Sequence, residues 1–272
     1  MKRPLSLLAV VASAALLQGQ TPGPAPAKPP PERMNFVGCP VMRDTREVPC
    51  WLAEHKGELY YLGVQEDISG PFHPPQLKHR VLVEGVKTSK KLCGATVIEP
   101  LVISVLPEVE PACNRILPAQ GHKVDWHRRG PGPANRGLQL ATDPNPPPGR
   151  QPAPPPEPPY RPTPFVVRFG FDGEYINVHN FYGVQGAVAY AKAAKARSVE
   201  VRGARAAVLL SDGSIVTEQP RMAKLRAEKV GKALRELGIP ADTLKVSWNE
   251  QAAPPNGVDD YERRRVEILV TP

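Results

Sequence analysis

The sequence lacks the motifs that mark the common hydrolases and nucleotide-binding enzymes. It has only 6 histidines in 272 residues, and contains no H-E-x-x-H, no G-x-S-x-G and no glycine-rich phosphate loop. Zinc peptidases, serine hydrolases and nucleotide-binding enzymes need such groupings to place a metal, a nucleophile or a phosphate. Neither cysteine spacing offers the short C-x(2–4)-C pair typical of tetrahedral zinc sites. The sequence therefore predicts a protein that is not an enzyme and that has no cofactor or metal.

A block of one charge is also missing. The formal net charge is +8 and the isoelectric point about 9.4, but residues 33–120 contain ten basic and ten acidic side chains. Nucleic-acid-binding domains usually gather basic residues on one face or stripe. The diffuse excess of positive charge gives no support to a nucleic-acid partner.

Long apolar runs are limited to one. Lys2 and Arg3 precede the run Leu5–Leu17, which is followed by polar and Pro-rich sequence. This run is shorter than the roughly 20 residues of a membrane-spanning helix, and its order matches a secretory signal peptide. We expect a cleaved signal over residues 1–27, no transmembrane segment in the mature chain, and export to the periplasm.

Proline is abundant, with 35 residues beside 22 glycines. Pro-rich segments are extended and lack a core. They divide the chain into a spacer at residues 28–34, a cysteine-containing domain at 35–120, a linker at 121–164 and a second domain at 165–272. We expect the linker to act as a semi-rigid tether between two domains.

All four cysteines lie in the first of these domains: Cys39, Cys50, Cys93 and Cys113. Exported proteins form disulfides by default, and four cysteines permit three pairings that the sequence leaves open. The preferred hypothesis pairs Cys39 with Cys50 and Cys93 with Cys113. The domain shows short runs with strand character, such as residues 58–62 and 80–86. We expect a small disulfide-stapled all-β domain, whose strand order is weakly similar to an OB-type barrel.

The second domain shows the order βαβαββ, an α+β fold with helices on one face of a mixed sheet. Strands are predicted near residues 165–171, 198–203, 244–248 and 264–270, and a helix over 184–196. A second helix follows Pro220, because Ala223, Ala227, Val230, Leu234 and Leu237 recur at steps of four and three residues. Gly238 and Pro240 end that helix.

These residues resemble the OmpA-like C-terminal domain of Gram-negative envelope proteins. The resemblance covers residues 165–272 and rests on a strand ending in Gly203, the helix in PRMAKLRAEKVGKALRELGIP, and the closing strand RRVEI. It implies non-covalent binding of peptidoglycan. In that family an Asp and an Arg hold the charged groups of diaminopimelate in the stem peptide.

On this resemblance Arg226 takes the place of the family arginine. The family aspartate is less direct: counted forward from Gly203 its position is Ala206, whereas counted back from Arg226 it falls on Ser211, beside Asp212. Asp212 is then either the anionic ligand residue or part of a turn. The last strand departs as well, since Arg263 replaces the family Asn.

Two functions follow as expectations. The first is a periplasmic envelope protein, associated with the outer membrane or cell wall, that binds peptidoglycan through Arg226 and Asp212 and tethers the N-terminal domain, which could recruit other envelope proteins. The alternative is an OmpA-like domain with a degenerate ligand site that serves as a scaffold for protein contacts; Ala206 is the feature in its favour.

Overall fold

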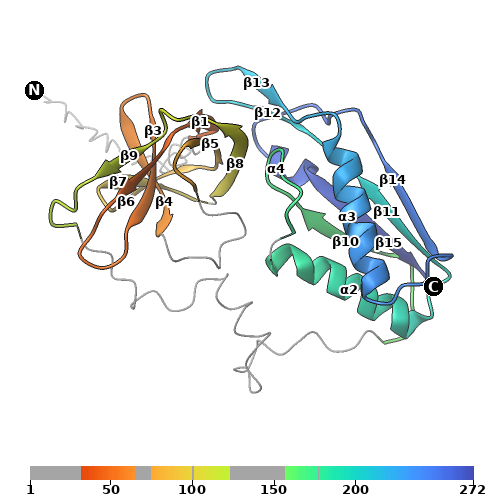
Figure 1. Cartoon of the computed structure of the whole chain (residues 1–272). Coiled ribbons are helices and arrows are strands. Elements are labelled where there is room, and N and C mark those ends of the chain that lie inside the picture. The colour runs from red at the N-terminus through yellow and green to blue at the C-terminus, as the bar shows by residue number, and fades with distance from the viewer. Residues whose placement is uncertain (1–31, 65–74, 100, 123–156, 177) are drawn as a thin grey trace, which may run out of the picture. The chain divides into compact units, whose positions relative to one another are not determined.

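The computed structural model describes residues 32–64, 75–99, 101–122, 157–176 and 178–272. The expected signal peptide and most of the Pro-rich linker lie outside these residues. All of these described residues belong to one compact unit. Within the described residues, strands fill the N-terminal domain, and helices alternate with strands in the C-terminal domain (Figure 1).

The N-terminal domain consists of short strands in two sheets: β1 (Phe36–Gly38), β2 (Pro40–Arg43), β3 (Cys50–His55), β4 (Glu58–Val64), β5 (His79–Glu84), β6 (Lys87–Leu92), β7 (Ala95–Ile98), β8 (Val102–Val109) and β9 (Arg115–Leu117). One sheet has the order β1-β5-β8 and the other β6-β7-β4-β3-β2-β9. Only Cys39 separates β1 from β2, so a single stretch of chain passes from one sheet to the other. Strands that change sheets in this way make the corners of barrel-like sandwiches. The expectation of an all-β domain is confirmed, while the similarity to an OB-type barrel stays a prediction.

Each sheet of this domain contributes to a buried core. One cluster includes Phe36, Trp51, Leu62 and Val83, and draws side chains from both sheets. A second cluster, with Leu52 and Val97, lies in the six-stranded sheet and contains two of the cysteines. Small domains have little core to bury, so cross-links contribute a large share of their stability.

The disulfides join positions far apart in the sequence. The structure pairs Cys39 with Cys113 and Cys50 with Cys93, and no described cysteine is free. The expectation of a disulfide-stapled domain is therefore confirmed, but the preferred local pairing was wrong. The reason is strand order: β2 lies between β9 and β3, and β4 lies between β3 and β7, so the sheet brings distant segments together.

The C-terminal domain is built on one four-stranded sheet with the order β10-β15-β11-β14. Its elements are β10 (Thr163–Arg168), α2 (Val178–Ala194), β11 (Ser198–Gly203), β12 (Ala207–Leu209), β13 (Ile215–Thr217), α3 (Met222–Glu236), β14 (Leu244–Trp248), α4 (Asp260–Arg263) and β15 (Arg265–Thr271). β11 pairs in parallel with β14 and antiparallel with β15. The predicted βαβαββ order is confirmed, with the hairpin β12–β13 and the short helix α4 added to it.

Helices α2 and α3 cover one face of this sheet (Figure 1). β11 alternates as expected, with Val199 and Val201 buried and Arg202 exposed. Gly203 ends the strand where α3 crosses it, and a Cβ atom there would lie 2.1 Å from the carbonyl oxygen of Ala223. Glycine is needed at this position because the helix backbone approaches too closely for any side chain.

The two domains contact each other through polar and apolar groups. The guanidinium of Arg264, immediately before β15, binds the carboxylate of Glu84 at the end of β5, and both side chains are buried. The Asn35 side chain donates to the carbonyl oxygens of Leu209 (3.1 Å) and Gly257 (2.9 Å). An apolar cluster joins residues of both domains: Leu82, Leu106, Phe171 and Val208. Among the described residues the two domains thus contact each other; most of the linker lies outside these residues, and its role as a semi-rigid tether stays a prediction.

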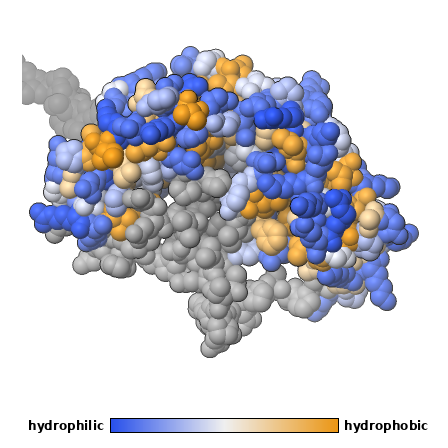
Figure 2. Space-filling view, in the orientation of Figure 1, coloured by the Kyte–Doolittle hydropathy of each residue, from blue (hydrophilic) through white to orange (hydrophobic). Residues whose placement is uncertain are grey.

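The drawn face of the molecule is mostly hydrophilic, with hydrophobic side chains in separate patches (Figure 2). No helix among the described residues has both the length and the apolar character to cross a bilayer. The two disulfides are typical of a protein outside the cytoplasm.

Candidate functional site

The candidate site is centred on Arg226 in α3. This helix buries one face, on which Ala223, Ala227 and Val230 pack against the sheet. Residues three and four apart share a helix face, so Arg226 is directed inward with them. Its side chain is 0% exposed, although it carries a full positive charge.

The guanidinium of Arg226 is surrounded by acceptors. Nε donates to the carbonyl oxygen of Gly173 and Nη2 to that of Gly170, each at 2.8 Å. Nη1 donates to the carbonyl oxygen of Ala204 at 3.4 Å, and the ring of Phe169 lies 5.2 Å from the guanidinium carbon. The chain turn after β10 therefore fixes the direction in which this cation faces.

The charge of Arg226 is neutralised by Glu218. Both Nη atoms bind its carboxylate, with Nη1 to Oε2 at 3.0 Å, and the Glu218 side chain is also 0% exposed. A buried guanidinium needs such a paired, hydrogen-bonded anion, because an unpaired buried charge is very unfavourable. Glu218 thus supplies the anion of the site from within the chain.

Two backbone amides complete the contacts of this carboxylate. Ala206 N–H donates to Oε2 at 2.9 Å and Asp172 N–H donates to Oε1 at 3.0 Å. Arg226 and these two amides together make a binding site for a carboxylate, which Glu218 occupies. We call this arrangement the Arg226 carboxylate site. Ala206, the position counted forward to the family aspartate, contributes its amide rather than a side-chain anion.

A second carboxylate, Asp172, lies beside this site. Its Oδ1 accepts a hydrogen bond from Gln219 N–H at 2.7 Å, which ties the turn after β10 to the segment that carries Glu218. Burial, and to a smaller extent the negative charge of Glu218, raises the pKa of Asp172. The turn and the Glu218 segment are therefore coupled through hydrogen bonds at two points.

Asp212 lies in the turn between β12 and β13. Its Oδ1 accepts hydrogen bonds from Ser214 N–H at 2.9 Å and Ser214 Oγ at 2.6 Å, which lower the pKa of Asp212. Asp212 is exposed and, among the described residues, makes no hydrogen bond or ion pair with Arg226. The structure therefore does not bring these two predicted ligand residues together, and their role toward peptidoglycan stays a prediction.

Sequence reasoning missed Glu218. The available signal was a lone acidic residue eight positions before Arg226, next to Gln219 and Pro220. Its importance depends on the hairpin β12–β13, which returns the chain to Ala206 so that Glu218 N–H donates to the Ala206 carbonyl oxygen at 3.2 Å. Neither strand of this hairpin is longer than three residues, so the sequence pattern is too short to predict the hairpin.

Asp260 shows a different use of a buried carboxylate. It is 1% exposed and accepts backbone N–H groups from Leu209, Asn256 and Gly257 at 2.8 to 2.9 Å. These bonds fasten β12 to the loop before α4. Asp260 therefore has a structural role in this domain.

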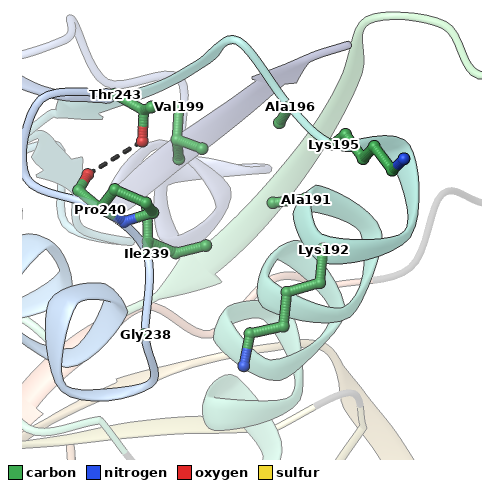
Figure 3. A pocket seen from close by; sticks show the side chains of 9 residues that line it. All are labelled: Ala191, Lys192, Lys195, Ala196, Val199, Gly238, Ile239, Pro240 and Thr243. Carbon is green, nitrogen blue, oxygen red and sulfur yellow. Dashed lines mark hydrogen bonds between the residues drawn. The ribbon is translucent and has the colours of Figure 1, made fainter.

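A cavity of about 240 Å³ lies near the C-terminal ends of α2 and α3 (Figure 3). Its lining is largely apolar, with Lys192 and Lys195 at the side. In Figure 3 the two amino groups point in different directions, so they do not converge on one anion. The Thr243 hydroxyl donates to the Pro240 carbonyl oxygen at 2.9 Å and is already satisfied. No group of His, Cys, Asp and Glu side chains in the described part of the chain could hold a metal ion.

Comparison with known proteins found likeness in structure only. No family model matches the chain, and no curated protein matches it. Solved structures to which the chain is similar include the OmpA-like domain of FopA1 from Francisella tularensis (19% identity, 39% of this chain and 70% of that one, TM-score 0.31), the periplasmic domain of Helicobacter pylori MotB (19%, 42% and 79%, 0.32), and a MotB-like protein from Desulfovibrio vulgaris (16%, 39% and 69%, 0.30). At these identities the likeness concerns the fold of the matched region.

Proposed function

We propose that the protein is an exported cell-envelope protein whose OmpA-like C-terminal domain serves as an interaction scaffold, with its carboxylate site occupied by Glu218. The observation that carries this proposal is the buried Glu218–Arg226 pair. An external ligand cannot reach the guanidinium while Glu218 is in place, because both side chains are 0% exposed. The site then stabilises the fold instead of selecting a ligand.

The contacts between the domains support the same proposal. Arg264, the first residue of the RRVEI run, binds Glu84 of the N-terminal domain instead of facing solvent. Asn35 and Ser211 exchange two hydrogen bonds, Asn35 N–H to Ser211 Oγ at 2.8 Å and Ser211 N–H to the Asn35 carbonyl oxygen at 2.7 Å. These contacts, made by the residue before β15 and by the turn of the β12–β13 hairpin, support a role in which the C-terminal domain holds the N-terminal domain.

A second candidate is non-covalent binding of peptidoglycan in the periplasm. It is favoured by the composition of the Arg226 carboxylate site: a guanidinium and two backbone amides already bind a carboxylate. A stem-peptide carboxylate has the same chemistry as Glu218 and could replace it if the segment after β13 moved away. Asp212 would then be the anion available for the ammonium group of diaminopimelate.

Co-sedimentation of the mature full-length protein with diaminopimelate-type peptidoglycan separates the two candidates. Scaffold function predicts that the wild type stays in the supernatant. Binding through Arg226 predicts pelleting that the double variant Glu218→Leu/Arg226→Met abolishes. This double variant removes the pair without leaving a buried charge, so circular dichroism can confirm that it still folds.

Two further variants sharpen this test. Asp212→Asn pellets less than wild type only if Asp212 contacts the ligand. Asp242→Asn is the matched control, because it removes an exposed carboxylate from another surface of the same domain. Pelleting of the wild type that depends on Arg226 would overturn the scaffold proposal.

A further inference from the structure

A second cavity, separate from the Arg226 carboxylate site, lies where the N-terminal domain meets the hairpin β12–β13. Its volume is about 300 Å³, at the lower end of the roughly 300–1,000 Å³ typical of small-molecule sites. The cavity combines an apolar lining with charged side chains, and its residues are Asn35, Phe36, Val37, His55, Arg80, Leu106, Leu210, Asp212 and Val216.

The lining brings two opposite charges to one small space. The Arg80 side chain is exposed and, among the described residues, makes no hydrogen bond or ion pair. Asp212 accepts hydrogen bonds from Ser214 through Oδ1 alone, so its Oδ2 has no partner in the described chain. No ion pair within 4.0 Å joins the two residues. Both charges are therefore free to bind groups of a ligand.

The backbone positions of Arg80 and Asp212 are both set by neighbouring strands and hydrogen bonds. The pairing of β5 with β8 is irregular between His79 and Val81, so Arg80 lies at an interruption of the ladder, where side chains are commonly redirected toward a site. Ser211, adjacent to Asp212, exchanges hydrogen bonds with Asn35, and its Oγ donates to the Arg33 carbonyl oxygen at 3.2 Å. The N-terminal domain thus holds the turn that carries Asp212.

The other titratable groups near the cavity leave this charge pattern intact. Burial, and next the positive charge of Lys56, lowers the pKa of His55, so its imidazole is neutral at pH 7. The His55 ring stacks on Phe36 with centroids 4.5 Å apart and forms part of the cavity wall. The hydrogen bonds from Ser214, and to a smaller extent the positive charge of Lys56, lower the pKa of Asp212. Arg80 and Asp212 remain as the charged groups among the lining residues.

We propose that this cavity binds a free α-amino acid with an aliphatic side chain, whose carboxylate is held by Arg80 and whose ammonium group is held by Asp212. The aliphatic chain packs against Val37, Leu106 and Val216, which supply apolar surface in the same lining. A single amino acid suits the small volume, and a guanidinium binds a carboxylate through two parallel hydrogen bonds. The proposal uses neither Arg226 nor Glu218, and it shares only Asp212 with the peptidoglycan candidate.

Titration of the full mature chain with L-leucine, followed by NMR chemical shifts, tests this proposal. We expect saturable shifts confined to the cavity residues. Arg80→Gln and Asp212→Asn should each weaken binding about tenfold or more, since each removes one charge-assisted hydrogen bond. Arg235→Gln and Asp242→Asn are matched controls, because they neutralise exposed charges outside the cavity and should leave the affinity within twofold.

Two ligand analogues assign the contacts. Leucinamide lacks the carboxylate, so its weaker binding should no longer depend on Arg80, and N-acetyl-leucine lacks the ammonium group, so its binding should no longer depend on Asp212. Arg80→Gln should not change co-sedimentation with peptidoglycan, because Arg80 is exposed and takes no part in the Arg226 carboxylate site, so the outcome of the leucine test and that of the peptidoglycan test can be told apart. Two results would overturn the proposal: no saturable shifts at leucine concentrations up to about 20 mM, or a leucine affinity that is unchanged in both cavity variants.

Discussion

Glu218 and Arg226 form an ion pair from which solvent is excluded, with both side chains 0% exposed and two backbone amides on the same carboxylate. Burying a charge is strongly unfavourable unless the partner and the hydrogen bonds are complete. Here they are complete, so the pair is stable as a unit, but the loss of either member leaves an uncompensated charge.

Glu218→Ala should therefore lower the free energy of unfolding by about 3 to 5 kcal/mol. Urea denaturation followed by circular dichroism measures this change. Glu236→Ala is the matched control, since Glu236 pairs with Lys232 on the surface and should change stability by no more than about 0.5 kcal/mol. The double variant Glu218→Leu/Arg226→Met should recover part of the loss, because it removes the uncompensated charge but leaves the amides of Ala206 and Asp172 without their acceptor. Equal effects of the two single substitutions would contradict the burial of the pair.

The regular part of the C-terminal domain could be predicted from the sequence. Strands β11 and β14 have the bounds that alternation predicts, and the steps of four and three residues after Pro220 locate α3. The glycine after that helix, Gly238, has φ +93°, as expected for a helix C-terminus. Local periodicity was sufficient because these elements bury one regular face.

Other parts depend on contacts that periodicity does not contain. Helix α2 begins at Val178, well before the predicted start at Val184, because Gly183 fits against the Val166 carbonyl oxygen, where a Cβ atom would lie at 2.5 Å. Glycine lowers helix propensity, so the sequence argued against helix at this place. The Glu218–Arg226 and Glu84–Arg264 pairs join elements through tertiary packing, and no spacing rule connects their members.

Glu84→Ala should uncouple the two domains. The Glu84 carboxylate neutralises Arg264, whose side chain is 0% exposed, so its removal leaves a buried cation at the contact. Unfolding can be followed with single-tryptophan variants that retain Trp51 in the N-terminal domain or Trp248 in the C-terminal domain. The two transitions should coincide in the parent proteins and separate after Glu84→Ala. Glu99→Ala, which breaks an exposed pair with Lys90, should leave them coincident.

Gly203→Ala should destabilise the C-terminal domain by several kcal/mol, roughly the range of severe overpacking. The added Cβ would lie 2.1 Å from the Ala223 carbonyl oxygen and 2.9 Å from the Ala227 Cβ, so α3 must move away from the sheet. Gly186→Ala is the comparison, since its Cβ would meet only the Phe165 ring, at 3.2 Å, and alanine favours helix. Thermal unfolding should show a large decrease in Tm for the first variant and a small change for the second.

The N-terminal domain should become less stable in acid as Glu58 is protonated. Hydrogen bonds from Lys87, then from Thr96 and Tyr60, lower the pKa of Glu58 from 4.5 to about 2. A carboxyl group with a depressed folded-state pKa stabilises the fold above its unfolded pKa, and this contribution is lost as the pH falls toward the folded value. The Tm difference between wild type and Glu58→Gln should therefore be full at pH 6 and should shrink between about pH 4.5 and 2. A difference that stays constant over this range would show that the depressed pKa is absent.

The disulfide pairing gives a covalent test of the N-terminal fold. Peptide mapping of oxidised protein, without reduction, should recover a Cys39–Cys113 peptide and a Cys50–Cys93 peptide. The closed loops span sequence separations of 74 and 43 residues, for which chain entropy predicts a stabilisation of about 4 kcal/mol each. The paired variants Cys39→Ala/Cys113→Ala and Cys50→Ala/Cys93→Ala should each lose stability of that order in urea denaturation and leave no free thiol. A mixed pair, such as Cys39→Ala/Cys50→Ala, should instead leave two free thiols, because each remaining cysteine has lost its partner. Recovery of a Cys39–Cys50 peptide from the wild type would contradict the order of strands β2, β3 and β9 in the six-stranded sheet.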